Sequence, residues 1–345
     1  MVWFLMKIFK TLFTTLFLFV LVAQSQPPLQ AENDAIFYKI TGNNIENPSY
    51  LFGTIHLMCD DEEFSRALIA QAVASTDRVL MEVDLSNPGE LLKKSSKALS
   101  KDVKPVKPKP FPEVLSKEES NLVIESLRKY SNFPLAFMKK LPMEMIIVLL
   151  SASPKTMGCS TSVNSYELKI AAAAKSNQKP IAGLETIEQQ FALLPKSKRT
   201  NNKNLFLKFI SEIENRKAKM INLRKIYFEQ NANQLFELTT SQLEDDPKFQ
   251  AKLLDERNQA WIPKIEKRLE NESLFIAVGA AHLGGDKGLL KLLRERGYTL
   301  EPIKLKKQVE PQRSLQTTLP IISFSSTSPN SRLSELSSGL SPNRE

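Results

Sequence analysis

The sequence predicts an α/β protein with a central mixed sheet, built from two β-loop-α-β units that each carry a G-x-x-H motif, and with a large helical insertion. The first motif is GTIHL at 53–57 and the second is GAAHL at 279–283. Their histidines, His56 and His282, are the only two in 345 residues. Each motif follows an apolar run and precedes a segment with helical spacing, which is the order of elements in such a unit.

The first unit begins near residue 36 and ends at Asp84. Its segments are a strand at 36–40, a turn at 42–44, a strand at 50–52, a helix at 62–76 and a buried strand at 79–81. Period-two alternation and β-branched or aromatic residues mark the strands, and apolar residues at helical spacing mark the helix. Glu82 therefore follows directly after a strand.

The insertion covers about residues 86–270. Apolar spacing predicts helices at 115–130, 134–150, 165–176, 201–244 and 247–270, with a boundary at Pro142 and a short strand near 180. The short strand leads into GLET, which places Glu185 just beyond a strand end.

The second unit contains the clearest strand, 274–278, which runs straight into the second motif. A helix at 287–296, a stop at Gly297 and a last strand at 298–305 follow. Both motifs extend to G-x-x-H-L-x-x-D. We therefore expect a duplicated element at the two ends of one sheet.

The two ends of the chain fall outside the predicted domain of residues 27–307. Residues 1–26 combine two lysines, a short apolar run and a small-x-small site, which is typical of a cleaved export signal. An uncleaved anchor is the alternative, although the run is shorter than the roughly 20 residues of a membrane span. Residues 308–345 are rich in Ser, Thr, Pro and Asn, and predict a disordered tail. The mature protein is therefore expected to be periplasmic or extracellular.

The net charge of +9 does not indicate a nucleic-acid partner. The predicted signal contributes two of the nine charges, and residues 306–345 contribute two more. Seven lysines lie between residues 93 and 109, in a Pro-rich stretch without interleaved aromatic residues. That composition predicts an extended, solvated loop, with a patch for membrane headgroups or nucleic acid as the alternative. No nucleic-acid module is recognisable.

The two histidines are candidate metal ligands. In a sheet with crossover helices, sites form at the carboxyl ends of the strands, and a glycine there lets the backbone turn so that the histidine points back over the sheet edge. Carboxylates are needed to complete a hydrolytic metal site. Glu82 and Glu185 are the first candidates, and Glu167, on the helix after Ser165, is the third. Their alternatives are surface carboxylates and a charge at a helix N-terminus.

Three further groups of residues have a predicted role. Asp60 and Asp286 are expected to cap the helices that follow the two motifs. Arg257 and Asn258 lie on a helix, where spacing alone predicts a solvated face. The two cysteines, Cys59 and Cys159, are expected to form a disulfide in an oxidising compartment, with thiolate ligation of a metal as the alternative.

Six segments, in order, resemble the TraB/GumN family, which is related to the Tiki proteases and more distantly to erythromycin esterase-like and ChaN-like proteins. They are SYLFGTIHL, RVLMEVDL, MGCSTSVNSYELKIA, KPIAGLETIEQQ, LLDERNQAW and LFIAVGAAHLGGDKGLLKLLRERGY. The resemblance covers roughly residues 33–305. It implies an α/β fold and a metal-dependent protease activity with manganese or cobalt.

The resemblance also implies roles for individual residues. His56 and His282 match the family's G-x-x-H histidines, Glu82 matches the glutamate after the second strand and Glu185 falls in GLET. Arg257 and Asn258 match the family's Arg-Asn pair, which implies that both belong to the site rather than to a solvated face.

These observations predict an exported metal-dependent hydrolase, most concretely a peptidase. His56 and His282, with Glu82 or Glu185, would hold a divalent ion, with zinc as the alternative metal, and the other glutamate would act as general base. Arg257 would bind substrate or stabilise an oxyanion. The signatures H-E-x-x-H, G-x-S-x-G and the P-loop are absent from the sequence. The alternatives are a non-catalytic metal or haem-binding envelope protein, and an interaction protein that acts through its tail and Lys-Pro loop.

Overall fold

In the computed structural model, six strands form one mixed sheet in the order β7-β5-β8-β2-β1-β9. The structure describes residues 35–60, 62–64, 66–87, 89–91, 93–95, 109–193, 202–241 and 246–309. The strands are β1 (Phe37–Gly42), β2 (Ser49–Thr54), β5 (Arg78–Met81), β7 (Ile181–Gly183), β8 (Leu274–Gly279) and β9 (Tyr298–Pro302). The predicted α/β fold with a central mixed sheet is confirmed.

Four neighbouring strands run parallel, and their ends align. β8 pairs with β2 on one side and with β5 on the other, and β5 pairs with β7. The register places Thr54 opposite Gly279 and Met81 opposite Gly183. The carboxyl ends of all four strands therefore share one edge of the sheet. β1 is antiparallel to both β2 and β9.

The two β-loop-α-β units interleave instead of lying at the two ends of the sheet, as we expected. The strands that lead into the two histidine motifs, β2 and β8, are direct neighbours in the centre of the sheet. The first unit crosses over β8 through α2 (Arg66–Ala74) to reach β5. The second crosses over β2 and β1 through α15 (Leu289–Glu295) to reach β9. A central position buries both strands, which suits their apolar sequences.

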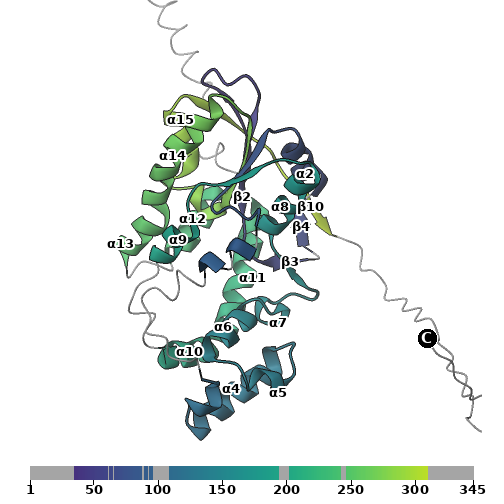
Figure 1. The fold of residues 1–345 in the computed structure, drawn as a ribbon, viewed down its shortest axis with the longest axis vertical. Helices are drawn as coiled ribbons and strands as arrows, with labels where there is room; N and C mark the ends of the chain where they lie inside the picture. The colour runs from purple at the N-terminus through teal and green to yellow at the C-terminus, as the bar shows by residue number, and fades with distance from the viewer. Residues whose placement is uncertain are drawn as a thin grey trace, which may run out of the picture. The chain divides into compact units, whose positions relative to one another are not determined.

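Helices cover both faces of the sheet, as Figure 1 shows. α14 (Glu256–Leu269) and α15 lie on one side, and α2 and α8 (Tyr166–Ser176) on the other. Aromatic side chains fill the core: the ring of Phe52 lies 5.3 Å from Tyr166 and 5.7 Å from Phe37. Each of these side chains is almost fully buried, which contributes roughly 1.5–3 kcal/mol per side chain relative to exposure.

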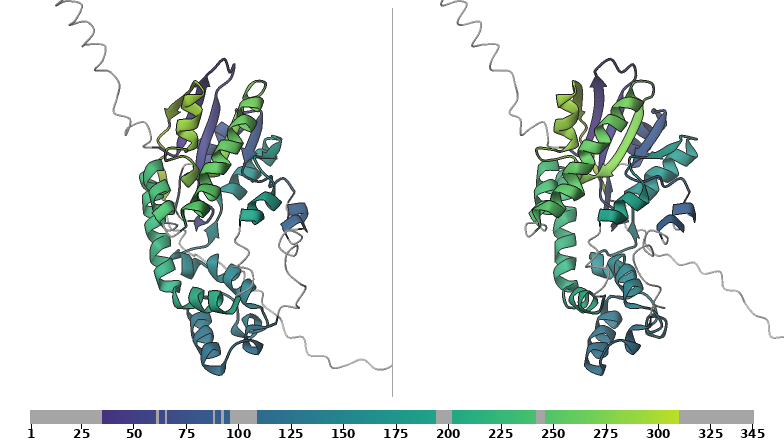
Figure 2. Two further views of the ribbon diagram at one scale, coloured as in Figure 1. Left: turned by 90° about the vertical axis from the view of Figure 1, so that its left-hand side faces the viewer. Right: turned by 60° about the vertical axis from the view of Figure 1, so that its left-hand side comes forward.

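A second hydrophobic cluster lies in the insertion, around Phe111, Leu127, Ile146 and Phe206. Between β5 and β8 the described residues also form α4 (Lys117–Tyr130), α5 (Leu135–Met138), α6 (Met143–Ser151), α7 (Pro154–Met157), α9 (Ile187–Leu193), α10 (Asn202–Ser211), α11 (Ile213–Glu229), α12 (Ala232–Ser241) and α13 (Pro247–Gln250), in addition to α8 and α14. The predicted boundary at Pro142 is confirmed, because Pro142 is the N-cap of α6. Figure 2 shows the long α11 leading from α10 to α12.

The long helical region predicted at 201–244 consists of three helices within its described residues, 202–241. Helix α11 is followed by its C-cap Gln230, which has a left-handed conformation (φ +60°). The helix predicted at 62–76 begins only at Arg66, since residues 62–64 form β4 (Glu62–Phe64), which pairs with β10 (Lys307–Val309). Strand β10 also extends two residues beyond the predicted domain end at residue 307.

Several predictions concern residues outside the described part of the chain. These predictions are the export signal at 1–26, the tail beyond Val309 and most of the Lys-Pro loop, residues 96–108. Within the described ranges, no helix combines the length and the apolar character that crossing a bilayer requires.

Candidate functional site

The shared strand edge brings the predicted carboxylates together. Beyond the last ladder pair of β5 and β7, the amide of Leu184 donates to Met81 O at 2.7 Å, and the amide of Glu185 donates to Glu82 O at 2.9 Å. The two glutamates that follow these strands are therefore adjacent. Both side chains are largely buried, with exposed fractions of 14% for Glu82 and 7% for Glu185.

The motif glycines are required for close packing and not for a left-handed turn. A Cβ on Gly53 would lie 2.7 Å from a methyl group of Leu283 and 3.0 Å from Cα of Ala280. A Cβ on Gly279 would lie 3.3 Å from Oε1 of Glu82. Neither glycine has a positive φ. The first glycine thus lets the two motif loops pack together, and the second lets the Glu82 carboxylate approach the backbone.

The buried face of α14 carries Arg257, Asn258 and Trp261. A π-helical segment, η4 (Ala251–Asp255), leads into this helix, and such segments are frequent at functional sites. Arg257 and Trp261 are four residues apart, so that the guanidinium lies 4.7 Å from the centre of the indole ring. The spacing of ERN-x-x-W therefore directs three side chains toward the sheet edge.

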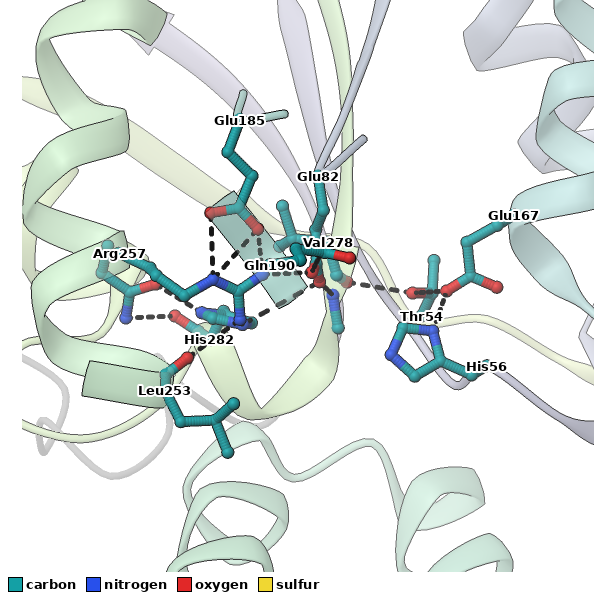
Figure 3. A network of polar contacts seen from close by, with 12 residues as sticks. Thr54, His56, Glu82, Glu167, Glu185, Gln190, Leu253, Arg257, Val278 and His282 are labelled. Carbon is teal, nitrogen blue, oxygen red and sulfur yellow. Dashed lines mark hydrogen bonds and ion pairs between the residues drawn. The ribbon is translucent and has the colours of Figure 1, made fainter. Parts of the chain in front are cut away.

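Arg257 is the centre of a polar network, shown in Figure 3. Its Nε donates to both carboxylate oxygens of Glu185, each at 3.2 Å, and Nη2 donates to Glu185 Oε1 at 2.7 Å. Nη2 also donates to Glu82 Oε2 at 2.5 Å, and Nη1 donates to the carbonyl of Leu253 at 2.9 Å. One guanidinium thus compensates the charges of two buried carboxylates.

His282 is neutral and has a defined tautomer. Arg257 Nη1 lies 3.0 Å from His282 Nε2, and since arginine only donates, Nε2 is the unprotonated acceptor. Nδ1 therefore carries the proton, which it donates to Asn258 Oδ1 at 2.6 Å. Burial, together with the charge of Arg257, lowers the pKa of His282 to about 4 despite the opposing charge of Glu82. The centre of the imidazole ring lies 4.6 Å from that of the Trp261 ring, and the two planes are tilted by 41°.

Asn258 orients the second histidine loop. Besides accepting from His282, it donates from Nδ2 to the backbone carbonyls of His282 at 3.3 Å and Lys287 at 2.8 Å. Its side chain is only 1% exposed, so these three bonds satisfy a buried amide. The Asn258 amide group is therefore occupied within the protein.

Glu82 is ionised and lies next to the second motif. Its Oε1 accepts from the amide of Gly279 at 2.7 Å, and its Oε2 accepts from Gln190 at 3.2 Å as well as from Arg257. Burial opposes ionisation, but the charge of the Arg257 guanidinium and the hydrogen bond from the Gly279 amide outweigh it, so the pKa of Glu82 falls below its ordinary value. Oε1 is 3.9 Å from Nε2 of His282.

His56 forms a separate pair with Glu167. Its Nδ1 lies 2.8 Å from Glu167 Oε1, which also accepts from Thr54 Oγ1 at 2.7 Å. Ser165 donates to the other oxygen of Glu167 at 2.7 Å. The hydrogen bond with Glu167 raises the pKa of His56 to about 9. Burial disfavours the charged carboxylate, but the His56 hydrogen bond and charge lower the pKa of Glu167 to about 2.

The two imidazoles do not converge in the way that we predicted. In Figure 3 the carboxylate of Glu82 lies between His56 and His282, and Arg257 already contacts Nε2 of His282. Within the part of the chain that the structure describes, no group of three or more His, Cys, Asp or Glu side chains is gathered so as to hold a metal ion.

The donor chemistry nevertheless suits a divalent ion. Metal-binding histidines generally donate their other ring N–H to a carboxylate or carbonyl, which fixes the ring. Both histidines have this partner on Nδ1: Glu167 for His56 and Asn258 for His282. The second ring nitrogen of His56 faces the side where Glu82 lies. His282 can bind a metal through Nε2 only after the hydrogen bond from Arg257 to this nitrogen is broken.

Two cavities adjoin the network, and His56 and Glu82 line both. The first, of about 220 Å³, also reaches Arg257 and His282. The second, also of about 220 Å³, reaches Glu167 and Gln190. A substrate in either cavity would lie beside both His56 and Glu82.

The predicted helix caps are wrong for both motif aspartates. Asp60 accepts from Ser162, Asn164 and Lys169, and so links the first motif loop to the segment before α8. The helix that it was expected to cap begins only at Arg66. Asp286 is 95% exposed and pairs with Lys291, whereas the N-cap of α15 is Gly288.

The predicted disulfide between Cys59 and Cys159 is present. Cys59 belongs to β3 (Met58–Cys59), which pairs with β6 (Val163–Asn164). The two residues after β6 are Ser165, which caps α8, and Tyr166, the first residue of that helix, so the disulfide lies close to the segment that presents Glu167 to His56.

Sequence reasoning missed three members of the network. Thr54 lies inside the first motif, but no role was predicted for its side chain. Gln190 contacts Glu82 from α9, and no spacing in the sequence signals this contact. Trp261 was part of the ERN-x-x-W resemblance, but its ring contacts with Arg257 and His282 were not predicted.

A sequence model described as the TraB/PrgY/gumN family matches residues 36–302, which is more than half of the chain. The resemblance found in the sequence is thereby confirmed. The match includes every side chain of the network in Figure 3. No similar protein was found among curated proteins, and no similar chain was found among solved structures.

Proposed function

The chain belongs to the TraB/PrgY/gumN family, and we propose that it is a metal-dependent hydrolase that cleaves amide bonds in peptides or proteins. The observation that carries this proposal is the matched orientation of the two histidines. Each G-x-x-H imidazole donates Nδ1–H to a fixed acceptor, Glu167 or Asn258, which reserves its Nε2 for another partner.

His56 and His282 are the residues that would hold a divalent ion, manganese or cobalt by resemblance or zinc. When bound, such an ion lowers the pKa of a water ligand and polarises a carbonyl. The charge balance supports a cation here. The network contains three ionisable carboxylates, those of Glu82, Glu167 and Glu185. The positive groups that contact them are the guanidinium of Arg257 and the protonated imidazole of His56, which leaves one negative charge without a cation.

The other groups of the network have distinct tasks in this proposal. Glu82 is ionised and lines both cavities, so it accepts the proton of the attacking water. Arg257 supplies positive charge for the developing oxyanion, and its bonds to Glu185 hold it in place. Glu185 is thus assigned to positioning and not to ligation.

Export is part of the proposal. The disulfide between Cys59 and Cys159 suits an oxidising compartment such as the periplasm or the extracellular space. Cell fractionation of the tagged full chain would test this assignment, and recovery of the reduced protein from the cytoplasm would contradict it.

The haem-binding alternative receives less support. A haem requires a large apolar slot beside the ligating imidazole, whereas Glu82 and Arg257 line the cavity beside His282. The adjoining cavity of about 220 Å³ is also smaller than the roughly 300–1,000 Å³ typical of ligand pockets.

Metal analysis of the purified protein beside the His56→Ala/His282→Ala double variant tests the proposal. We expect close to one equivalent of divalent metal in the wild type and a large loss of both metal and peptide hydrolysis in the variant. Asp286→Asn is the matched control, because Asp286 lies in the second motif but outside the network. Equal metal content in wild type and double variant would overturn the metal assignment.

A further inference from the structure

The cavity beside His282 has a polar end and an apolar remainder. His56, Glu82, Arg257 and His282 lie among its lining residues, and all four belong to the network described above. The rest of the lining is mainly apolar and comes from α11, α12, η4 and the two motif loops. It includes Ile55, Leu223, Tyr227, Leu235, Leu253 and Leu254. Among the residues that the structure describes, no other charged side chain lines the cavity.

The volume suits one side chain. A cavity of about 150 Å³ lined by apolar side chains is known to admit benzene and to stay dry when empty, so about 220 Å³ is sufficient for a leucine or phenylalanine side chain. It remains below the roughly 300 Å³ at which pockets enclose whole small ligands. The occupant therefore has one compact apolar group inside and a polar group at the mouth.

We propose that this cavity is the specificity pocket of the enzyme and receives one aliphatic or aromatic side chain of an extended peptide, at the residue next to the scissile amide. The inference rests on the proposed function and adds the substrate class. The polar end places an amide beside Glu82 and Arg257 when the apolar group fills the remainder, since these residues share the same cavity. A polar or charged side chain would lose its hydration there without finding a partner.

Two substitutions change the pocket without altering the polar network. Thr239→Phe, from α12, reduces the space, and Leu223→Asn, from α11, keeps a side chain branched at Cγ but makes the wall polar. Neither residue bonds to a network side chain; Thr239 Oγ1 donates only to the Leu235 carbonyl. Leu122→Asn is the matched control, because Leu122 is 60% exposed on α4 and does not line the cavity.

The test measures binding and cleavage separately. Titration of the full chain with N-acetyl-leucinamide and N-acetyl-glycinamide is expected to show at least about tenfold tighter binding of the leucine probe, because burial of even one methylene group discriminates by roughly 10–200-fold. Thr239→Phe and Leu223→Asn are expected to remove this preference, and Leu122→Asn to keep it. Circular dichroism of each variant establishes that it is folded.

Cleavage of peptides that differ only in that residue separates the two proposals. A preference for leucine in binding without any hydrolysis supports the pocket and contradicts the proposed activity. Hydrolysis without preference for an apolar residue supports the activity and overturns the pocket. Equal binding of both probes, or tighter binding of octanamide than of N-acetyl-leucinamide, also overturns the inference, the latter in favour of an acyl chain.

Discussion

Arg257 donates from Nη1 to Nε2 of His282 across 3.0 Å, so the histidine of the second motif is held as a neutral acceptor by a cation. The same guanidinium bonds Glu82 and Glu185, which come from two neighbouring strand ends. One arginine on α14 therefore fixes the relative positions of a histidine and two carboxylates. Its side chain is 10% exposed, so these bonds form largely out of water.

Replacement of Arg257 by methionine is expected to destabilise the fold. The substitution leaves Glu82 and Glu185 buried without their cation, and loss of one partner of a buried ion pair costs about 3–5 kcal/mol. Urea unfolding at pH 7 measures the change in free energy. Arg296→Met is the control, since the Arg296 side chain is 58% exposed in its 3.8 Å pair with Glu266, and its loss is expected to change stability by less than about 0.5 kcal/mol. Equal losses for the two variants would contradict this account.

The effect of Glu167 on His56 can be measured directly, because the chain has only two histidines. In metal-free protein the pKa of His56 is expected near 9, and Glu167→Gln is expected to lower it toward the ordinary value of about 6.5. His282 is expected to stay neutral down to a pH of about 4 in both proteins. NMR titration of the histidine ring protons follows both groups. An unchanged His56 pKa in the variant would rule out the pairing.

The same substitution has a functional consequence under the proposed function. Loss of the carboxylate that orients a metal-binding histidine typically reduces metal affinity or activity by about 10–100-fold. Glu167→Gln is expected to show such a reduction in bound metal and in peptide hydrolysis. Asp286→Asn, which changes an exposed carboxylate in the other motif, is expected to leave both unchanged. A Glu167→Gln enzyme with full metal content and activity would limit Glu167 to a structural role.

The sequence predicted the parts of the site that depend on strand ends. Apolar runs that stop at a glycine or glutamate located β2, β5, β7 and β8, and parallel pairing then brought Glu82 and Glu185 to the same edge as the two motifs. These features are local in the sequence, so periodicity and turn residues reveal them. The fold class followed from the same observations.

The contacts between distant segments could not be predicted in this way. His56 bonds Glu167, 111 residues later, and Arg257 bonds Glu82 across 175 residues. The packing of the insertion decides which carboxylate pairs with which cation, and this packing cannot be predicted from composition or local spacing. Asp60 shows the same limit. A local rule predicted a helix cap, whereas the carboxylate bonds groups more than 100 residues away because β3 pairs with β6.

Reduction of the disulfide is expected to destabilise the protein. The bond between Cys59 and Cys159 spans 100 residues, and a loop of that length corresponds to about 4–5 kcal/mol in the chain-entropy model. Urea unfolding with and without dithiothreitol measures the difference. The Cys59→Ser/Cys159→Ser variant serves as control, because its stability is expected to be low and insensitive to the reductant. A wild type that is equally stable when reduced would contradict the prediction.

The two functions of the Asn258 side chain can be separated. Asn258→Asp keeps an oxygen that accepts from His282 Nδ1 but loses the donors to two backbone carbonyls, whereas Asn258→Leu loses all three bonds. Each buried group left without a partner costs about 1–3 kcal/mol. Both variants are therefore expected to unfold at lower urea concentration. Only Asn258→Leu is expected to abolish hydrolysis under the proposed function, since it alone releases the imidazole. Equal activity in the two variants would show that the acceptor on Nδ1 is dispensable.

Asp60 predicts a specific dependence of stability on pH. The hydrogen bond from Asn164, together with those from Lys169 and Ser162, lowers the pKa of Asp60 from 3.8 to about 2. A carboxylate with a lowered pKa stabilises the fold above its unfolded pKa, and this contribution is lost as the pH falls toward the folded pKa. Asp60→Asn is thus expected to destabilise the protein at pH 7, by less than about 1 kcal/mol because 37% of the side chain is exposed. The difference between wild type and variant is expected to shrink between pH 4 and pH 2 in urea unfolding series. A constant difference over that range would show that Asp60 acts through shape or neutral hydrogen bonds and not through its charge.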